Sequence, residues 1–247
     1  MPYEKTEAIL IRTTDFSETS RVFSFFTRRF GRITTLAKGA KRKYSRMIGQ
    51  VDLFSYGEIV FASGWLRDRM HILAEACAFE TFPAIRRDLA RYYAASHAAA
   101  LARAMTEEDD PDRALFDALL GLLRHLQDGV APGVALPAFE AQFLVRTGFL
   151  PELRRCIVCG REPGGGAVSF SPGAGGIVCR DCSRNRDGLV RNVPSGALKL
   201  LSSLAEGRVT RLDRIRIAAP VARQVRRLLN EYETYLLARP LRTAKHL

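Results

Sequence analysis

Two stretches of this chain share one spacing of cysteines: Cys156-Ile157-Val158-Cys159 and, after nineteen residues, Cys179-Arg180-Asp181-Cys182. Each C-x2-C pair lets a tight turn direct two sulfur atoms at one ion, and the segment between the pairs is long enough to bring them together. Four thiolates would fill every ligand position of a tetrahedral ion, so none would stay open for water or a substrate. The sequence therefore predicts one structural Zn²⁺, bound by Cys156, Cys159, Cys179 and Cys182.

Two other interpretations of these cysteines are a pair of disulfides and a redox-active C-x-x-C motif. The chain begins without an apolar targeting segment, so we expect a reducing compartment, the cytoplasm, where disulfides are rare. Neither pair follows an expected strand and opens an expected helix, as a thioredoxin motif would. The fifth cysteine, Cys77, lies in an apolar stretch and is predicted to be a small buried residue rather than a nucleophile.

The composition predicts a globular protein that binds polyanions. With 247 residues, of which 47% are hydrophobic, the chain can bury a core as one large domain or as two or three smaller ones. No apolar run approaches the roughly 20 residues that cross a bilayer, so we expect no contact with a membrane. The formal net charge is +12, and so basic a protein attracts nucleic acids.

The positive charge is concentrated in one run near the N-terminus that contains no acidic residue. Over nineteen positions this run holds eight basic residues: Arg28, Arg29, Arg32, Lys38, Lys41, Arg42, Lys43 and Arg46. A run of like charges is usually a solvated face, but eight cations repel one another, and folding alone gives no reason to gather them. We therefore predict that they form a phosphate-binding surface.

The N-terminal third shows five stretches of β-branched, apolar and aromatic residues separated by turns. They predict strands at residues 5–12, 22–27, 33–37, 53–61 and 70–79. Five strands without a long helix favour a small closed barrel of the OB type, a fold that leaves no exposed sheet edge and commonly binds nucleic acids. Most of its aromatic residues are expected in the core, whereas Phe30, Tyr44 and Trp65, in or near turns, are candidates for stacking on bases.

From Pro83 onward the pattern becomes helical. The spacing of apolar residues and the cap signals predict helices at residues 84–106, 111–126, 136–147, 195–204 and 221–237. Asp110 is the expected N-cap of the second helix, before Pro111. Between the cysteine pairs, two glycine clusters flank an apolar stretch that ends at Phe170. This arrangement favours a β-hairpin over a phosphate-binding glycine loop, because no Gly-Lys-Ser/Thr follows.

The sequence as a whole predicts an α+β multidomain fold. We expect a nucleic-acid-binding OB-type, five-stranded β-barrel at residues 1–82, then a mainly α-helical domain at residues 83–247, with a zinc ribbon or knuckle module inserted at residues 153–190. The four histidines are far apart, and none belongs to a nucleophile or metal-hydrolase motif. No catalytic residue is predicted, and we expect a binding protein rather than an enzyme.

Six arginines surround the cysteine pairs and leave two interpretations open. Four thiolates on Zn²⁺ carry a net charge of minus two, so nearby arginines can neutralise the cluster instead of holding DNA. The arginines concerned are Arg154, Arg155, Arg161, Arg180, Arg184 and Arg186.

The order of these parts resembles the RecO family of bacterial DNA repair proteins, over essentially the whole chain. The most specific matches are the turn Leu36-Ala37-Lys38-Gly39-Ala40-Lys41-Arg42, the segment 139–159 with Thr147-Gly148-Phe149-Leu150-Pro151, the second cysteine pair, and the final helix at residues 235–242.

The resemblance implies a recombination mediator associated with the bacterial nucleoid. Such a protein binds single- and double-stranded DNA and anneals complementary strands. With RecR, and in some cases RecF, it loads RecA onto DNA covered by single-strand binding protein, whose C-terminal tail is a further expected partner. By position, the resemblance assigns phosphate contacts to Lys38, Lys41, Arg42, Lys43 and Arg46, with Arg28, Arg29 and Arg32 on neighbouring strands.

The residues alone leave two other functions open. A zinc-containing nucleic-acid-processing enzyme would need an open metal position or a cluster of carboxylates, and the sequence offers neither. An RNA-binding factor stays open because charge and an OB-type barrel do not separate RNA from DNA.

Overall fold

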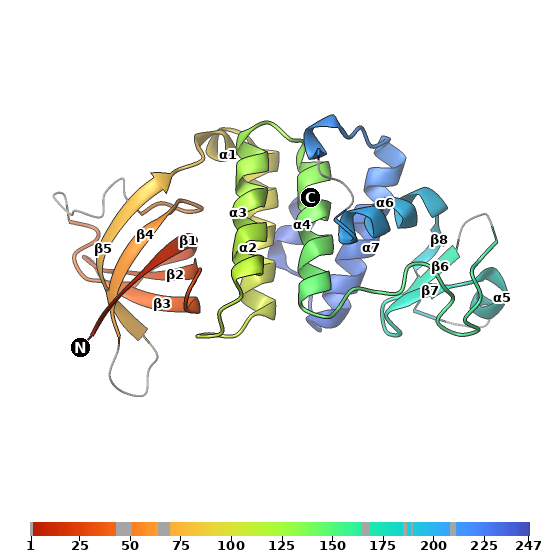
Figure 1. Cartoon of the computed structure of the whole chain (residues 1–247), viewed down its shortest axis with the longest axis horizontal. Helices are drawn as coiled ribbons and strands as arrows, with labels where there is room; N and C mark the ends of the chain where they lie inside the picture. The colour runs from red at the N-terminus through yellow and green to blue at the C-terminus, as the bar shows by residue number, and fades with distance from the viewer. Residues whose placement is uncertain are drawn as a thin grey trace. The chain divides into compact units, whose positions relative to one another are not determined.

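The computed structural model describes residues 2–42, 51–63, 70–164, 168–184, 187–188, 190–207 and 211–247. The chain divides into two compact units, residues 1–127 and residues 128–247. Figure 1 labels the helices and strands of both units. Within the described ranges, no helix is both long and apolar enough to cross a membrane.

The first unit begins with a closed barrel of five strands. They are β1 (Tyr3–Asp15), β2 (Arg21–Thr27), β3 (Gly31–Ala37), β4 (Tyr56–Ala62) and β5 (Met70–Glu80). The order around the barrel is β1-β2-β3-β5-β4, and every neighbouring pair is antiparallel except β3 and β5. The predicted five-stranded barrel of the OB type is confirmed, and Figure 1 shows the strands curving around one interior.

The barrel interior is filled by side chains that alternate along the strands. In β3, Ile33, Thr35 and Ala37 are buried, while the residues between them are half-buried. A period of two is expected where one face of a strand lines a core. The buried cluster consists of Ala8, Leu10, Phe23, Phe25, Ile33, Ala37, Ala40, Ile59, Phe61 and Leu73.

Three helices complete the first unit: α1 (Pro83–Arg87), α2 (Leu89–Met105) and α3 (Arg113–Gln127). The sequence predicted a single helix over residues 84–106, but the structure divides this segment into α1 and α2. Asp88 has an extended backbone and its carboxylate accepts a hydrogen bond of 3.0 Å from the amide of Arg91. An aspartate in this role begins a new helix, which explains the break.

The predicted start of α3 is wrong by two residues. The cap is Asp112 rather than Asp110, because the Asp112 carboxylate accepts hydrogen bonds from the amides of Ala114 and Leu115 at 2.8 and 3.0 Å. The backbone at Asp110 instead passes close to the barrel. A Cβ atom at Gly31, which has a φ of +64°, would lie 2.2 Å from the Asp110 carbonyl oxygen, so only glycine fits there.

The second unit combines helices with a small sheet. Its elements are α4 (Pro132–Arg146), β6 (Val168–Ser171), β7 (Gly176–Val178), α5 (Arg180–Ser183), β8 (Val190–Val193), α6 (Ser195–Ala205) and α7 (Ala219–Leu236), with short 3-10 helices at Leu212–Arg214 and Arg242–His246. Strands β6 and β7 form the predicted hairpin, and β8, which the sequence pattern did not predict, completes a sheet of order β7-β6-β8.

Helices α4, α6 and α7 pack together around leucine side chains and the buried carboxylates of Glu140 and Glu233, which both pair with Arg226. Arg226 of α7 donates two hydrogen bonds from one nitrogen to both carboxylate oxygens of Glu140 in α4, at 2.6 and 2.7 Å. Glu140 is fully buried. A buried carboxylate is tolerated only when it is paired, so this contact fixes α7 against α4.

The prediction for Cys77 is wrong, because this residue is exposed. It lies in β5, opposite Glu58 of β4. The apolar run around it suggested burial, but neighbouring side chains of a strand point to opposite faces, and here only Leu73 of that run is buried.

Candidate functional site

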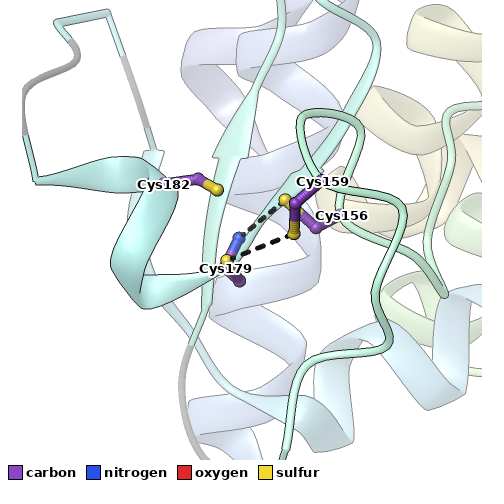
Figure 2. Close-up of side chains that lie close together, drawn as sticks. All are labelled: Cys156, Cys159, Cys179 and Cys182. Atoms are coloured by element: carbon purple, nitrogen blue, oxygen red, sulfur yellow. Dashed lines mark hydrogen bonds between the residues drawn. The ribbon is translucent and has the colours of Figure 1, made fainter.

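Folding brings the four predicted cysteines together. The sulfur atoms of Cys156, Cys159, Cys179 and Cys182 all lie within 4.8 Å of one another. Figure 2 shows Cys156 and Cys159 on the loop that follows α4, facing Cys179 at the start of α5 and Cys182 within it. The sulfurs of Cys159 and Cys179 are 3.9 Å apart, and all four cysteines are free rather than disulfide-bonded.

This spacing fits a tetrahedral metal ion. Zinc–sulfur bonds of about 2.3 Å place neighbouring sulfurs of a tetrahedron about 3.8 Å apart, whereas a disulfide requires about 2.05 Å. The four cysteines thus form a cluster that is compatible with a zinc site. Sulfur would take every tetrahedral position around such an ion and leave none open for water or a substrate.

Backbone hydrogen bonds shape the first cysteine pair into a knuckle. The Gly160 amide donates to the Cys156 carbonyl oxygen at 2.7 Å, and the Cys156 amide donates to the Arg161 carbonyl oxygen at 2.9 Å. Gly160 has a φ of +73°, a conformation that glycine adopts without strain. The amide of Cys179 then donates to the Cys156 sulfur at 3.3 Å, which joins the two pairs.

These contacts divide the cysteines by acidity. Burial opposes ionisation of Cys156, but amide donors from Cys179, Cys159 and Val158 outweigh it and lower its pKa to about 6. A hydrogen bond from the Arg161 backbone is the largest cause that lowers the pKa of Cys159. Hydrogen bonding to Cys179, with burial, raises the pKa of Cys182 to about 12. Four thiolates this close repel one another, and a cation among them would remove that repulsion.

The sheet of the second unit positions this knuckle. The Ile157 amide donates to the Ile177 carbonyl oxygen at 3.0 Å, and Ile177 in turn donates to the Glu152 carbonyl oxygen at 2.9 Å. Phe170 of β6 is fully buried and packs edge-on against Tyr232 of α7, with ring centroids 5.6 Å apart. The cysteine module is thereby anchored to the helices of the same unit.

Most arginines around the cysteines have partners inside the chain. Arg154 pairs with Glu206, while Arg155 pairs with Glu162 at 3.8 Å and Arg184 with Asp181 at 3.9 Å. A hydrogen bond to Cys159 raises the pKa of Arg161. Arg180 is exposed and makes no ion pair with another described residue, and Arg186 lies outside the described residues. The neutralising role is therefore supported for Arg161, whereas Arg154, Arg155 and Arg184 are paired with carboxylates rather than with the cysteine sulfurs.

The basic run of the barrel does not form one uniform surface. Arg28 lies between two carboxylates, 2.9 Å from Glu7 and 2.7 Å from Asp117 of α3. Arg32 pairs with Glu108 at 2.8 Å, and its side chain is only 19% exposed. Arg28 thus joins the barrel to α3, and Arg32 joins it to the segment between α2 and α3. The run contains no acid in sequence, yet acids from distant segments reach it in space.

Two more members of the run have intramolecular partners. Arg29 donates to the Lys5 carbonyl oxygen at 3.1 Å and lies over the Phe30 ring at 5.2 Å from its centroid. The Lys41 ammonium binds the Asp15 carboxylate at 3.1 Å and donates to the Ser17 carbonyl oxygen at 3.2 Å. Lys41 therefore joins the turn after β3 to the turn after β1.

Like Arg29 and Lys41, the cations Lys38 and Arg42 of this run are exposed. Both lie in the basic turn, residues 38–42, directly after β3. The Arg42 amide donates to the Gly39 carbonyl oxygen at 3.0 Å, which closes the turn, and Gly39 has a φ of +71°. Neither side chain makes an ion pair with any residue that the structure describes. Lys43 and Arg46 lie outside the described residues.

Of the three candidate stacking residues, the structure describes only Phe30. Phe30 is partly buried and packs edge-on against the core residue Phe61, with ring centroids 5.4 Å apart. Tyr44 and Trp65 lie outside the described residues. The sequence pattern missed Phe16, which is 60% exposed in the turn between β1 and β2. The available signal was a single aromatic residue inside a polar stretch.

These features define the class of the protein. It is a multidomain chain with an OB-like barrel, a helical region and a four-cysteine cluster compatible with zinc. A family model described as Recombination protein O N terminal matches residues 1–82, and one described as Recombination protein O C terminal matches residues 86–245. The chain therefore belongs to the RecO family of DNA repair proteins.

Individual relatives support the same assignment. DNA repair protein RecO from Roseiflexus sp. (strain RS-1) is 33% identical over 239 residues, which cover 97% of this chain and 83% of the relative. The protein of the same name from Desulforudis audaxviator (strain MP104C) is 33% identical over 243 residues, or 98% of this chain and 95% of the relative. DNA repair protein RecO from Rhodopirellula baltica (strain DSM 10527 / NCIMB 13988 / SH1) is 36% identical over 185 residues, which cover 74% of this chain and 68% of the relative. The resemblance found in the sequence is confirmed.

Proposed function

We propose that this protein is a non-enzymatic recombination mediator, which binds single- and double-stranded DNA and anneals complementary strands. The observation that carries the proposal is the basic turn of the barrel. Lys38 and Arg42 are exposed there without an ion pair among the described residues, beside cations that the fold has neutralised. Charge that the fold leaves uncompensated is available for phosphate groups.

We propose that Lys38 and Arg42 make the main phosphate contacts, with Lys43 and Arg46 as further contacts from the same run. Lys41 contributes charge nearby while it holds the turn together. Arg28, Arg29 and Arg32 are assigned weaker contacts, because each already has a partner inside the chain. Binding to DNA would require those partners to be shared or released.

Annealing has a simple physical basis on such a surface. Cations that contact phosphates reduce the repulsion between two polyanionic strands, and backbone contacts leave the base edges free to pair. No nucleotide hydrolysis is needed. From family membership we further propose that the protein acts in the bacterial cytoplasm with RecR, and with RecF, to load RecA onto DNA covered by single-strand binding protein, and that it contacts the C-terminal tail of the latter.

We also propose that the four-cysteine cluster binds one Zn²⁺ with a structural role. The sulfur spacing, the amide donor at Cys156 and the low pKa of that thiol support this assignment. When bound, the ion supplies folding free energy to the second unit, as zinc does in small cysteine-ligated domains.

Annealing of complementary strands coated with single-strand binding protein tests the proposed function. The wild-type protein should accelerate annealing, and the Lys38→Ala/Arg42→Ala variant should do so much less. Lys5→Ala is a matched control, because Lys5 is a barrel cation already paired with Glu58 at 2.8 Å. If folded, zinc-loaded wild-type protein does not accelerate annealing, or if it cleaves the strands, the proposed function is wrong. Measuring the affinity for RNA of the same sequence, at the same salt concentration, shows whether the protein prefers DNA or RNA.

A further inference from the structure

We propose that Phe16 is a platform on which a base of single-stranded DNA stacks, beside the phosphate contacts of the basic turn. The inference rests on the proposed DNA binding and adds a base-contacting residue to it. Phe16 follows β1 in the turn formed by residues 15–21, and 60% of its surface is exposed. An exposed ring of this kind can receive the face of any base.

The turn that carries Phe16 is ordered by its own hydrogen bonds. The amides of Phe16 and Ser17 donate to the Ser20 carbonyl oxygen at 3.1 and 3.2 Å. The Ser20 amide returns a hydrogen bond of 3.2 Å to the Ser17 hydroxyl. The Phe16 backbone is therefore fixed before any ligand arrives, which lowers the entropy cost of binding.

A single lysine joins this turn to the basic turn. The Lys41 ammonium binds Asp15 at 3.1 Å and the Ser17 carbonyl oxygen at 3.2 Å, the two residues on either side of Phe16. The Lys41 amide also donates to the Thr19 carbonyl oxygen at 3.0 Å. Since successive Cα atoms are about 3.8 Å apart, Phe16 lies next to the basic turn. Lys41 is a positioning residue in this arrangement.

The charge around the ring selects a polyanion as its partner. The turn of residues 15–21 and the basic turn together contain the acids Asp15 and Glu18 and four cations, which leaves a net charge of +2; the cations are Arg21, Lys38, Lys41 and Arg42. Single exposed apolar residues are common and need no function. An aromatic ring on an ordered turn, beside exposed cations, is the combination with which proteins bind single strands.

The stacking interaction requires an unpaired base. In a duplex the bases are already stacked inside the helix, and Phe16 could reach only the backbone. In a single strand, a base can leave its neighbours and lie on the ring, while adjacent phosphates contact Lys38 and Arg42. The proposal therefore gives the barrel a preference for single strands that cations alone do not provide.

Phe79 of β5 offers a matched control in the same barrel. It is also exposed, at 54%, but its ring packs edge-on against Tyr56, with centroids 5.5 Å apart. Its neighbour Glu80 binds Arg124 of α3. Replacing Phe79 removes an exposed phenylalanine without touching the two turns.

The experiment measures binding of the full-length protein to a fluorescent oligonucleotide by anisotropy, over a range of salt concentrations. Phe16→Ala should weaken binding to single strands roughly ten-fold, since stacking of one base on an aromatic residue is worth a factor of about five or more. Binding to duplex DNA and the slope of log K against log salt should not change. Phe16→Tyr should retain wild-type affinity, and Phe79→Ala should have no effect. An abasic strand, which keeps the phosphates, should bind Phe16→Ala and wild-type protein equally.

The outcomes separate this inference from the proposed function. If wild-type protein binds single strands but Phe16→Ala binds them equally well, the stacking role is wrong and Phe16 serves another contact, such as a protein partner. An equal loss on abasic or duplex DNA also overturns it, because the substitution then disturbs the basic turn. If the wild-type protein does not bind DNA at all, the proposed function itself fails.

Discussion

The basic turn of the barrel and the four-cysteine cluster both gather like charges, but the fold treats them in opposite ways. At the cysteines, amide donors and Arg161 face the sulfurs, and the geometry has room for one cation. At the basic turn, Lys38 and Arg42 face solvent without an ion pair among the described residues. Charge that is compensated inside the chain supports the fold, and charge left uncompensated is available to a ligand.

Arg28 and Arg32 show that the same distinction operates within the barrel. They belong to the same acid-free run as Lys38 and Arg42, yet Asp117 and Glu108 reach them from the helical part of the first unit. Although burial opposes the charged form, Glu7 and Asp117 raise the pKa of Arg28. Under the proposed function, the spatial partners of a cation, rather than its position in the sequence, decide whether its charge is available to DNA.

Replacing one of the four clustered cysteines should have the largest effect on the stability of the second unit. Cys159→Ser is expected to abolish stoichiometric zinc binding and to unfold the sheet β6–β8, because metal binding in small zinc peptides contributes on the order of 10 kcal/mol. Metal analysis and hydrogen exchange of residues 168–193 measure both effects. Cys77→Ser is the control, since Cys77 is exposed on the barrel and outside the cluster. Full zinc content in Cys159→Ser would show that the cluster is not the metal site.

A compensated cation of the barrel should affect stability more than binding. Arg32→Met removes the ion pair with Glu108 and a hydrogen bond to the Thr106 carbonyl oxygen, both partly buried. We expect the free energy of unfolding to fall by about 1–3 kcal/mol, because a partly buried carboxylate loses its partner. Urea unfolding measures this loss, and adding Glu108→Gln should recover part of it.

The exposed pair of Lys5 and Glu58 is the control for this measurement. The Lys5 side chain is 63% exposed, so Lys5→Met should leave the urea midpoint unchanged. If Arg32→Met keeps wild-type stability but loses DNA affinity, Arg32 belongs with the uncompensated cations and the comparison is wrong at this residue.

The sequence predicted the parts of the fold that depend on local patterns. The alternation around Ile33 and the spacing of Cys156 and Cys159 each follow from a short stretch, so the barrel strands and the cysteine cluster were predictable. The choice of Asp112 over Asp110 as the cap of α3 was not. Both are good caps, and the choice depends on how the preceding segment passes over Gly31 of the barrel.

The proposed DNA-binding surface was predictable from the sequence only as a region. Charge density indicated the basic run, but Arg28 and Asp117 are 89 positions apart, and no local pattern predicts that they meet. Phe16 was missed for a related reason. Its surroundings depend on Lys41, which reaches it only because β2 and β3 form a hairpin that returns the chain.

Replacing one uncompensated cation should change binding without changing stability. Arg42→Ala is expected to make the slope of log K against log salt shallower by about 0.7 for single strands. The variant makes one phosphate contact fewer, so its binding releases fewer counterions from the DNA. The urea midpoint should stay at the wild-type value, and Arg42→Lys should retain the slope. A lower midpoint in Arg42→Ala, with the slope unchanged, would place Arg42 among the residues that support the fold.

The smallest expected effect concerns Lys41, which links the basic turn to the turn that carries Phe16, at acid pH. Hydrogen bonds from Lys41 and Arg21 lower the pKa of Asp15 below its usual value. Because the folded-state pKa is the lower one, the contribution of Asp15 to stability is complete above the unfolded pKa of about 3.9. It is lost as the pH falls through the folded-state value. Asp15→Asn should therefore be less stable than the wild type at pH 7 and equally stable at strongly acid pH.

Hydrogen exchange at the Lys41 amide, which donates to the Thr19 carbonyl oxygen, reports this link directly. At pH 7, Asp15→Asn should exchange this amide faster than the wild type, while the Cys179 amide in the second unit exchanges equally in both. Asp213→Asn is the control, because Asp213 has a similarly lowered pKa from its pairing with Arg211 but belongs to the second unit. If Asp15→Asn leaves the Lys41 amide fully protected at pH 7, the backbone hydrogen bonds alone hold the turns together, and the Lys41 side chain joins Lys38 and Arg42 as a cation available to DNA.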